Sequence, residues 1–150
     1  MTPKIKTNWH LYNPDLEISF PSMKSWVEEN NSLMNRLRLL ETKIDLIVLD
    51  EQICKHHDAQ TSAEPVLGNL RKILLKSDHN LVFAESFFSQ DVIKEFAKFG
   101  RLEEEPLGKY LFSDSNIKKH ETYIADYELD DQTFMGRKCI YSYNDQKFSV

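Results

Sequence analysis

The sequence predicts an α+β fold, with a single antiparallel β-sheet as one layer and helices packed on one face of it. Most apolar segments are short and rich in β-branched or aromatic residues, which is typical of strands. These segments follow one another across short turns, which is how antiparallel neighbours are joined. The length of 150 residues fits one domain, so we expect residues 1–150 to form a single one.

The first element is expected to be helical. Ser22 is a candidate N-cap, and apolar residues follow it at helical spacing: Met23, Trp26 and Val27. The run Asn30-Asn31-Ser32 leaves two alternatives. Either the helix ends there and Ser32 caps a second one, or a single helix continues to Leu40.

The middle of the chain predicts a strand, a hairpin and a helix. Residues 44–53, IDLIVLDEQI, have the composition of a buried strand, and residues 56–68 resemble a loop. Residues 69–89 contain two β-rich runs on either side of a turn, which predicts a hairpin. A helix is expected next, with Ser89 as its N-cap and Gly100 just after its last residue.

Three more strands are expected in the last third of the chain. Their sequences are NIKKHETYIADYEL, MGRKCIYSY and QKFSV. Lys118, Lys119 and His120 lie in the first of them as a short basic patch, which we expect on an exposed strand face.

Composition excludes several classes of protein. The formal charge of −5 argues against nucleic acid as a partner, because phosphate binding needs a basic face. Two cysteines, Cys54 and Cys139, do not make a disulfide framework. The N-terminal residues lack a signal peptide's apolar region, and no run is long enough to span a membrane. We therefore expect a cytoplasmic protein, and separately we expect it to be a monomer. His56-His57-Asp58 lacks a further ligand at useful spacing, so we expect no metal.

The predicted hairpin gives one arginine an unusual position. If Asp78 and His79 form a two-residue turn, Arg71 lies opposite Ser86, and Lys72 lies opposite Glu85 on the other face. The face of Arg71 also carries small or apolar residues, namely Ile73, Leu75, Val82 and Ala84. A buried guanidinium needs an anion. That anion is either the carboxylate of a ligand in an apolar pocket or a glutamate of the protein, unless the arginine extends to solvent at a strand edge.

Five segments, in this order and spacing, are similar to the chorismate pyruvate-lyase family. They are SMK (22–24), LRKILL (70–75), VFAES (82–86), PLGKYLF (106–112) and GRK (136–138), and the resemblance covers residues 22–150. It implies helical flaps that close over an internal ligand, the chorismate lyase-like fold. It also implies a lyase that cleaves chorismate into 4-hydroxybenzoate and pyruvate, the first committed step toward ubiquinone. The resemblance implies no metal and no organic cofactor.

The resemblance also implies roles for particular residues. Arg71 and the backbone N–H groups of Met23 and Leu107 would bind the carboxylate of a small ligand, chorismate or 4-hydroxybenzoate. Ser86 stands where the family often has a second arginine, and Arg137 is a candidate for that missing charge. The family's glutamate would fall about two residues after Val150, and Glu121 and Glu128 are the first alternatives to it. We therefore expect the 150-residue chain to bind aromatic acids but to show weak or no lyase activity.

Two other functions remain open. The same fold serves as the effector-sensing domain of a class of bacterial transcription regulators, in which a helix-turn-helix domain comes first. About 20 residues precede the first matching segment here, too few for such a domain. A stand-alone binding protein for small aromatic acids, or a truncated lyase that binds without turnover, are the alternatives to an active enzyme.

Overall fold

The structure is a computed structural model that describes residues 2–18 and 20–150. Its centre is one antiparallel sheet with the strand order β1-β6-β7-β8-β5-β4-β3, and β2 also pairs with β6. The strands are β1 (Lys4–Ile5), β2 (His10–Leu11), β3 (Asp45–His56), β4 (Val66–Lys76), β5 (Asn80–Ser89), β6 (Ile117–Leu129), β7 (Gln132–Tyr143) and β8 (Gln146–Ser149). The predicted α+β class and antiparallel pairing are therefore confirmed.

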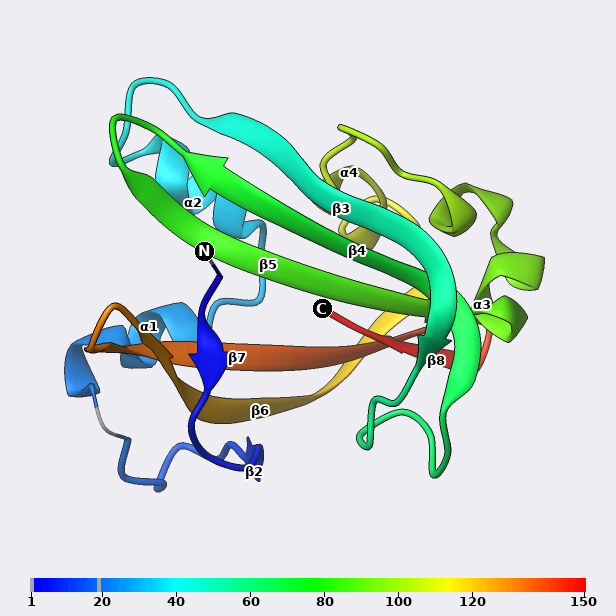
Figure 1. Cartoon of the computed structure of the whole chain (residues 1–150), viewed down its shortest axis with the longest axis horizontal. Helices are drawn as coiled ribbons and strands as arrows, with labels where there is room; N and C mark the ends of the chain where they lie inside the picture. Colours follow the sequence, from blue (N-terminus) through cyan, green and yellow to red (C-terminus); the bar gives the residue numbers. More distant parts are fainter. Residues whose placement is uncertain (1, 19) are drawn as a thin grey trace.

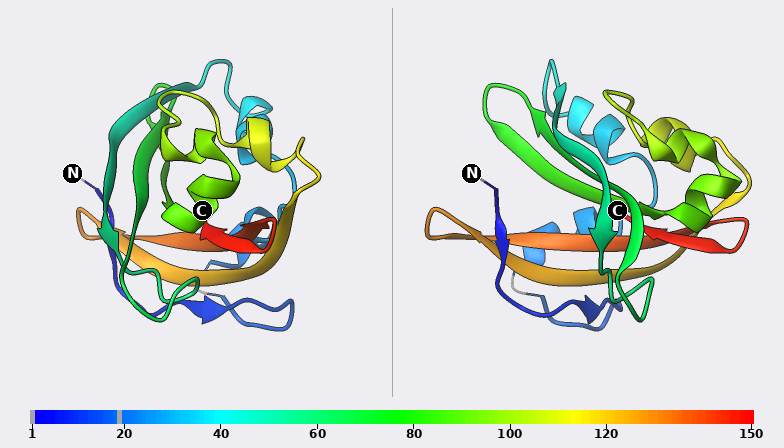
Figure 2. Two further views of the ribbon diagram at one scale, coloured as in Figure 1. Left: turned by 90° about the vertical axis from the view of Figure 1, so that its right-hand side faces the viewer. Right: turned by 45° about the vertical axis from the view of Figure 1, so that its right-hand side comes forward.

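The sheet is strongly curled into a half-barrel. β3, β4 and β5 form one side, β6 and β7 form the other, and the short β8 joins the two sides near one end (Figure 1). The helices lie in the hollow of this curve (Figure 2). We call this hollow side the concave face. That helical flaps close over an internal pocket stays a prediction.

The helical segments are all short. They are η1 (Pro21–Met23), α1 (Lys24–Val27), α2 (Leu33–Arg38), α3 (Gln90–Glu95), η2 (Ala97–Gly100) and α4 (Gly108–Leu111), where η marks a 3₁₀ helix. Ser32 caps α2 by accepting from Asn35 N, and Ser89 caps α3 by accepting from Val92 N. Of the two alternatives for residues 22–40, two separate helices is therefore the correct one. Ser22 caps nothing, because it lies inside η1. The helix after Ser89 ends early, since Phe96 is extended.

The β4–β5 hairpin has the predicted register. Arg71 pairs with Ser86 and Lys72 with Glu85, and the charged ends of the second pair lie 3.8 Å apart on the outer face. The predicted two-residue turn is wrong. The register shifts after Leu75, and the connection is a three-residue loop closed by a bond from Ser77 N to His79 O. The error lies beyond the paired residues, so it leaves the two faces unchanged.

Two strand expectations need correction. β3 is not buried, because it is the last strand of the sheet, and Ile53 on it is 50% exposed. The Lys118–His120 patch is not uniformly exposed. Lys118 and His120 face solvent, but a bulge between Lys119 and Thr122 leaves Lys119 paired with Tyr141 on the concave face.

The main core fills one end of the concave face. It joins α3 and η2 to β5, β7 and β8 through the buried residues Phe88, Val92, Phe99, Leu102, Cys139, Tyr141, Tyr143 and Phe148. Phe88 stacks on Phe99 with ring centroids 4.4 Å apart. Because Phe99 anchors the segment that follows α3, this core fixes where residues 100–107 lie against the sheet.

Among the described residues, no helix has the length and apolar character that crossing a bilayer requires.

Gly68 provides a test of this packing. A Cβ added there would lie 2.3 Å from the carbonyl oxygen of Phe88 and 2.7 Å from Cζ of Phe87. Backbone cannot move aside cheaply, so Gly68→Ala should lower the free energy of unfolding by about 1–3 kcal/mol. Gly108→Ala is the matched control, because its Cβ would meet nothing closer than 3.4 Å. Urea unfolding of both variants measures the difference, and equal stabilities would contradict the packing described.

Candidate functional site

Arg71 lies at the centre of the candidate site. Arg71 is only 2% exposed, and its pairing with Ser86 across the hairpin places its side chain on the concave face. Nε and Nη2 donate to the carbonyl oxygen of Glu103 at 3.2 and 2.7 Å, and Nη2 also donates to the carbonyl oxygen of Glu105 at 2.8 Å. This buried cation is thus held by neutral carbonyl oxygens of the segment that follows η2.

Two carboxylates act on the charge of Arg71 without forming an ion pair at close range. Burial lowers the pKa of Arg71, and the charges of Glu51 and Glu105 counteract that shift. An arginine stays protonated in any such environment. The sequence left two alternatives for the anion beside Arg71, a ligand carboxylate and a glutamate of the protein. These two alternatives therefore do not exclude each other. The protein supplies part of the counter-charge, and carbonyl oxygens supply the hydrogen bonds.

Glu51 fixes the segment that covers Arg71. It pairs with Arg71 across β3 and β4, and its carboxylate accepts from Leu102 N and Glu103 N, each at 2.8 Å. Asn69 donates to the same carboxylate and to Phe99 O, both at 2.9 Å. Arg71, Asn69 and Glu51 thus hold residues 99–105 from one patch of sheet, which we call the sheet latch.

The sheet latch gives a pH-dependent prediction. Burial alone would raise the pKa of Glu51, but hydrogen bonds from Asn69 and two backbone N–H groups hold that pKa below its usual 4.5. A lowered folded-state pKa means that Glu51 contributes stability above about pH 4.5, and this contribution is lost as pH falls through the folded-state pKa. Glu51→Gln should therefore be less stable than wild type at neutral pH, with a difference that shrinks in acid.

Urea unfolding at several pH values measures this effect. Glu64→Gln, at an exposed position in the loop before β4, is the control and should match wild type throughout. If the free energy of unfolding of Glu51→Gln stays below that of wild type by the same amount as the pH is lowered, ionisation of Glu51 does not stabilise the sheet latch.

The Pro106-Leu107-Gly108 corner adjoins Arg71. Glu105, which accepts from Arg71, immediately precedes it, and Leu107 is the N-cap of α4. The carbonyl of Leu107 accepts from Tyr110 N and Leu111 N, whereas its own N–H donates to no acceptor among the residues that the structure describes. The unused N–H of Leu107 is therefore only two residues along the chain from Glu105, whose carbonyl oxygen contacts the Arg71 guanidinium.

The other predicted site residues divide into two groups. Ser86 is 5% exposed and directly opposite Arg71, so the structure brings it together with Arg71 and the Leu107 corner. Met23 and Arg137 lie elsewhere: Met23 is an exposed residue at the end of η1, and Arg137 is on the same face of β7 as Tyr141. The N–H of Met23 donates to the carbonyl oxygen of Phe20, the N-cap of η1. Arg137 Nη1 donates to carbonyl oxygens of α1 and of the residue two positions after it.

Sequence reasoning missed Glu51, Asn69 and Lys119. An acidic residue inside an apolar strand was the one available signal for Glu51. Its pairing with Arg71 depends on the β3–β4 register across a long loop, which local patterns do not determine. Asn69 and Lys119 carried no signal of this kind. The alternatives Glu121 and Glu128 are both exposed.

The described residues show no cluster of candidate metal ligands. Within the described ranges, no three His, Cys, Asp or Glu side chains gather closely enough to hold a metal ion. His57 bonds to Ser62 O and Asp58 pairs with Lys138, so the His-His-Asp run points in separate directions. A groove of about 700 Å³ adjoins the sheet latch. Glu51 and Asn69 line it together with other residues of β3 and of the segment 100–104, but Arg71 does not.

Two comparisons with known proteins bear on the family of this chain. A family model described as chorismate lyase matches residues 5–150. A protein of Pseudoalteromonas translucida (strain TAC 125), described as a probable chorismate pyruvate-lyase, is 24% identical over 147 residues. The match covers 85% of this chain and 80% of that protein.

Proposed function

Because the chain belongs to the chorismate lyase family, we propose that it acts on chorismate and releases 4-hydroxybenzoate and pyruvate, the first committed step toward ubiquinone. In this reaction the C–O bond to the enolpyruvyl group breaks and the ring loses one proton as it becomes aromatic. The enolpyruvate takes up a proton and becomes pyruvate. The atoms balance without an oxidant, a reductant or a covalent intermediate on the protein.

The observation that supports this proposal most strongly is the burial of Arg71 beside the Leu107 corner. A ligand carboxylate is a better acceptor for a guanidinium than the carbonyl oxygens of Glu103 and Glu105. It would take over part of those bonds and accept from the free N–H of Leu107. Such donors are strong where water is excluded. Arg71, Leu107 and Ser86 would then hold the ring carboxylate.

Incubation of the purified protein with chorismate tests the proposal. The expected result is 4-hydroxybenzoate and pyruvate in equal amounts, formed faster than in protein-free buffer. Binding of 4-hydroxybenzoate without any acceleration would replace the enzyme by a binding protein, and failure to bind either acid would reject both.

One observation favours the binding protein as the second candidate. The carboxylates that act on Arg71 are already used. Glu51 accepts backbone N–H groups, while Glu105 accepts from Tyr110 and lies 3.2 Å from Lys98 Nζ. Hydrogen bonds from Tyr110 and Lys98 lower the pKa of Glu105. Neither group is free to exchange a proton with a ligand, which favours a chain that binds aromatic acids and turns chorismate over slowly.

A further inference from the structure

Lys119 is placed on the concave face by a local irregularity. The β6 bulge after Lys119 directs its neighbours Lys118 and His120 to solvent, and it leaves Lys119 on the same face as Tyr141 and Arg137. Half-buried lysines on a core-facing strand are costly unless they have partners. The function proposed above gives Lys119 no role.

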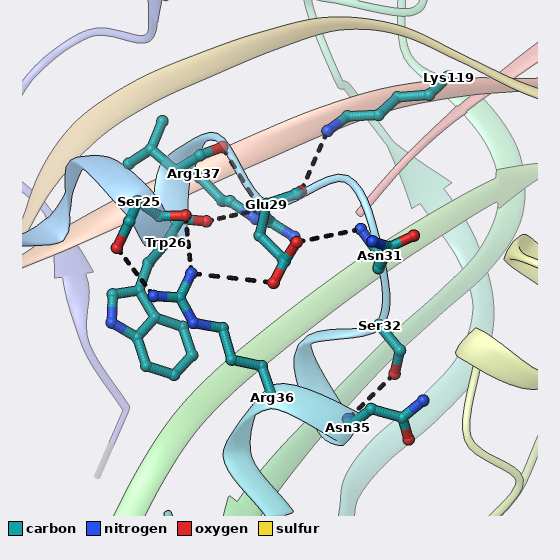
Figure 3. Close-up of polar contacts among 10 residues, drawn as sticks. Ser25, Trp26, Glu29, Asn31, Ser32, Asn35, Arg36, Lys119 and Arg137 are labelled. Atoms are coloured by element: carbon teal, nitrogen blue, oxygen red, sulfur yellow. Dashed lines mark hydrogen bonds and ion pairs between the residues drawn. The ribbon is translucent and has the colours of Figure 1, made fainter. Parts of the chain in front are cut away.

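Lys119 and Arg137 both contact the segment that joins α1 to α2. Arg137 Nη1 donates to the carbonyl oxygens of Trp26, Val27 and Glu29, at 2.8, 3.4 and 3.0 Å (Figure 3). Lys119 Nζ lies 3.4 Å from Glu29 O and 2.9 Å from Asn30 Oδ1. The two side chains thus approach one carbonyl oxygen, that of Glu29, from β6 and β7.

The two cations lack a close carboxylate. Among the described residues, no carboxylate oxygen lies within 4.0 Å of either Lys119 Nζ or the Arg137 guanidinium. The carboxylate of Glu29 acts on Lys119 from further away and lies 3.9 Å from Arg36, which also stacks over Trp26. Burial and the neighbouring Arg137 lower the pKa of Lys119. Two like charges held by neutral oxygens form a positive site that an anion would stabilise.

We propose that Lys119 and Arg137 form a binding site for a small carboxylate, separate from the ring-carboxylate site at Arg71. In the reaction proposed above, on which this assignment rests, the carboxylate that remains for it is that of the enolpyruvyl group. Lys119 is then a specificity-determining residue for a dianionic substrate. The carbonyl oxygens of residues 26–29 occupy the donors in the absence of ligand, and a carboxylate replaces them as the stronger acceptor.

Pyruvate is the probe, because it carries this carboxylate without the ring. Trp26 reports the exchange, since its carbonyl is one of those replaced, and Trp9→Phe leaves it as the single tryptophan. Pyruvate should change the fluorescence of this background. Lys119→Met should weaken pyruvate binding by on the order of tenfold to a hundredfold, and Lys119→Arg should largely restore it. Lys118→Met, the exposed neighbour, should bind as the parent does.

The ring-carboxylate site provides the cross-check. Lys119→Met should leave the affinity for 4-hydroxybenzoate unchanged and raise the KM for chorismate, and thermal unfolding confirms that each variant is folded. Absence of pyruvate binding in the parent, or equal losses in Lys118→Met and Lys119→Met, would overturn the proposal. If Lys119→Met does not fold, Lys119→Gln repeats the comparison. Lys119-dependent pyruvate binding without chorismate turnover would uphold this site and reject the lyase function.

Discussion

Replacing Arg71 with alanine should remove most of the stabilisation that 4-hydroxybenzoate gives to the wild-type protein. Ligand that binds only the folded state raises its stability by mass action. In the variant the ligand carboxylate would lose its charged partner in a site that excludes water. A hydrogen bond to a charged group contributes about 1.5–3 kcal/mol, so the affinity should fall on the order of tenfold to a hundredfold.

Lys72→Ala is the matched control for this experiment. Lys72 is the next residue of β4, but it points to the outer face and pairs with Glu85. Its loss should leave the affinity for 4-hydroxybenzoate within twofold or so of wild type, because surface ion pairs contribute little. Arg71→Ala also removes a contact to Glu103 and Glu105. Affinities are therefore compared by titration at a temperature where both variants are folded. Equal affinities would exclude Arg71 as the anchor.

A carboxylate supplied on a strand that continues β8 should give the second large effect. Val150 N and O both bond to Cys139, so the line of β8 already runs along β7 toward Arg137. Side chains alternate along a strand, and Val150 packs against the concave core. A residue two positions further would therefore face the same side, beside Arg137 on β7 and Ala84 on β5.

We expect slow chorismate turnover by the 150-residue chain, since the carboxylates that act on Arg71 are engaged. An extended strand with glutamate two positions beyond Val150 should raise the rate by about 10²–10⁴-fold, the usual contribution of a general acid or base. The same extension with glutamine is the control, because it completes the strand without the ionisable group. Full activity of the 150-residue chain, or equal rates for the glutamate and glutamine extensions, would show that another group exchanges the proton.

Local patterns were sufficient for the features that depend on neighbours in sequence. Alternation within the β4–β5 hairpin placed Arg71 opposite Ser86 on the buried face, because one tight connection relates the two strands. Ser89 was predicted as a cap, and Ser32 in one of two alternatives, for a similar reason, since a cap bonds to an N–H three residues away. These interactions are short in sequence and carry their own signal.

Features that depend on strand order or on an irregularity were not predictable. Ile53 resembles a core residue, and its exposure follows from β3 being the edge of the sheet. Lys119 resembles its exposed neighbours, and a bulge decides its direction. The partners of Arg71 were open because they are carbonyl oxygens of Glu103 and Glu105, which any side chain could carry. A backbone acceptor leaves no mark in the sequence.

A crystal structure of the protein with 4-hydroxybenzoate tests most directly whether the concave face is an aromatic-acid site built on Arg71. The account predicts the ligand carboxylate within hydrogen-bond distance of the Arg71 guanidinium and of the Leu107 N–H, with at least one bond from Arg71 to Glu103 or Glu105 released. A ligand bound elsewhere, with the three hydrogen bonds of Arg71 unchanged, would contradict it.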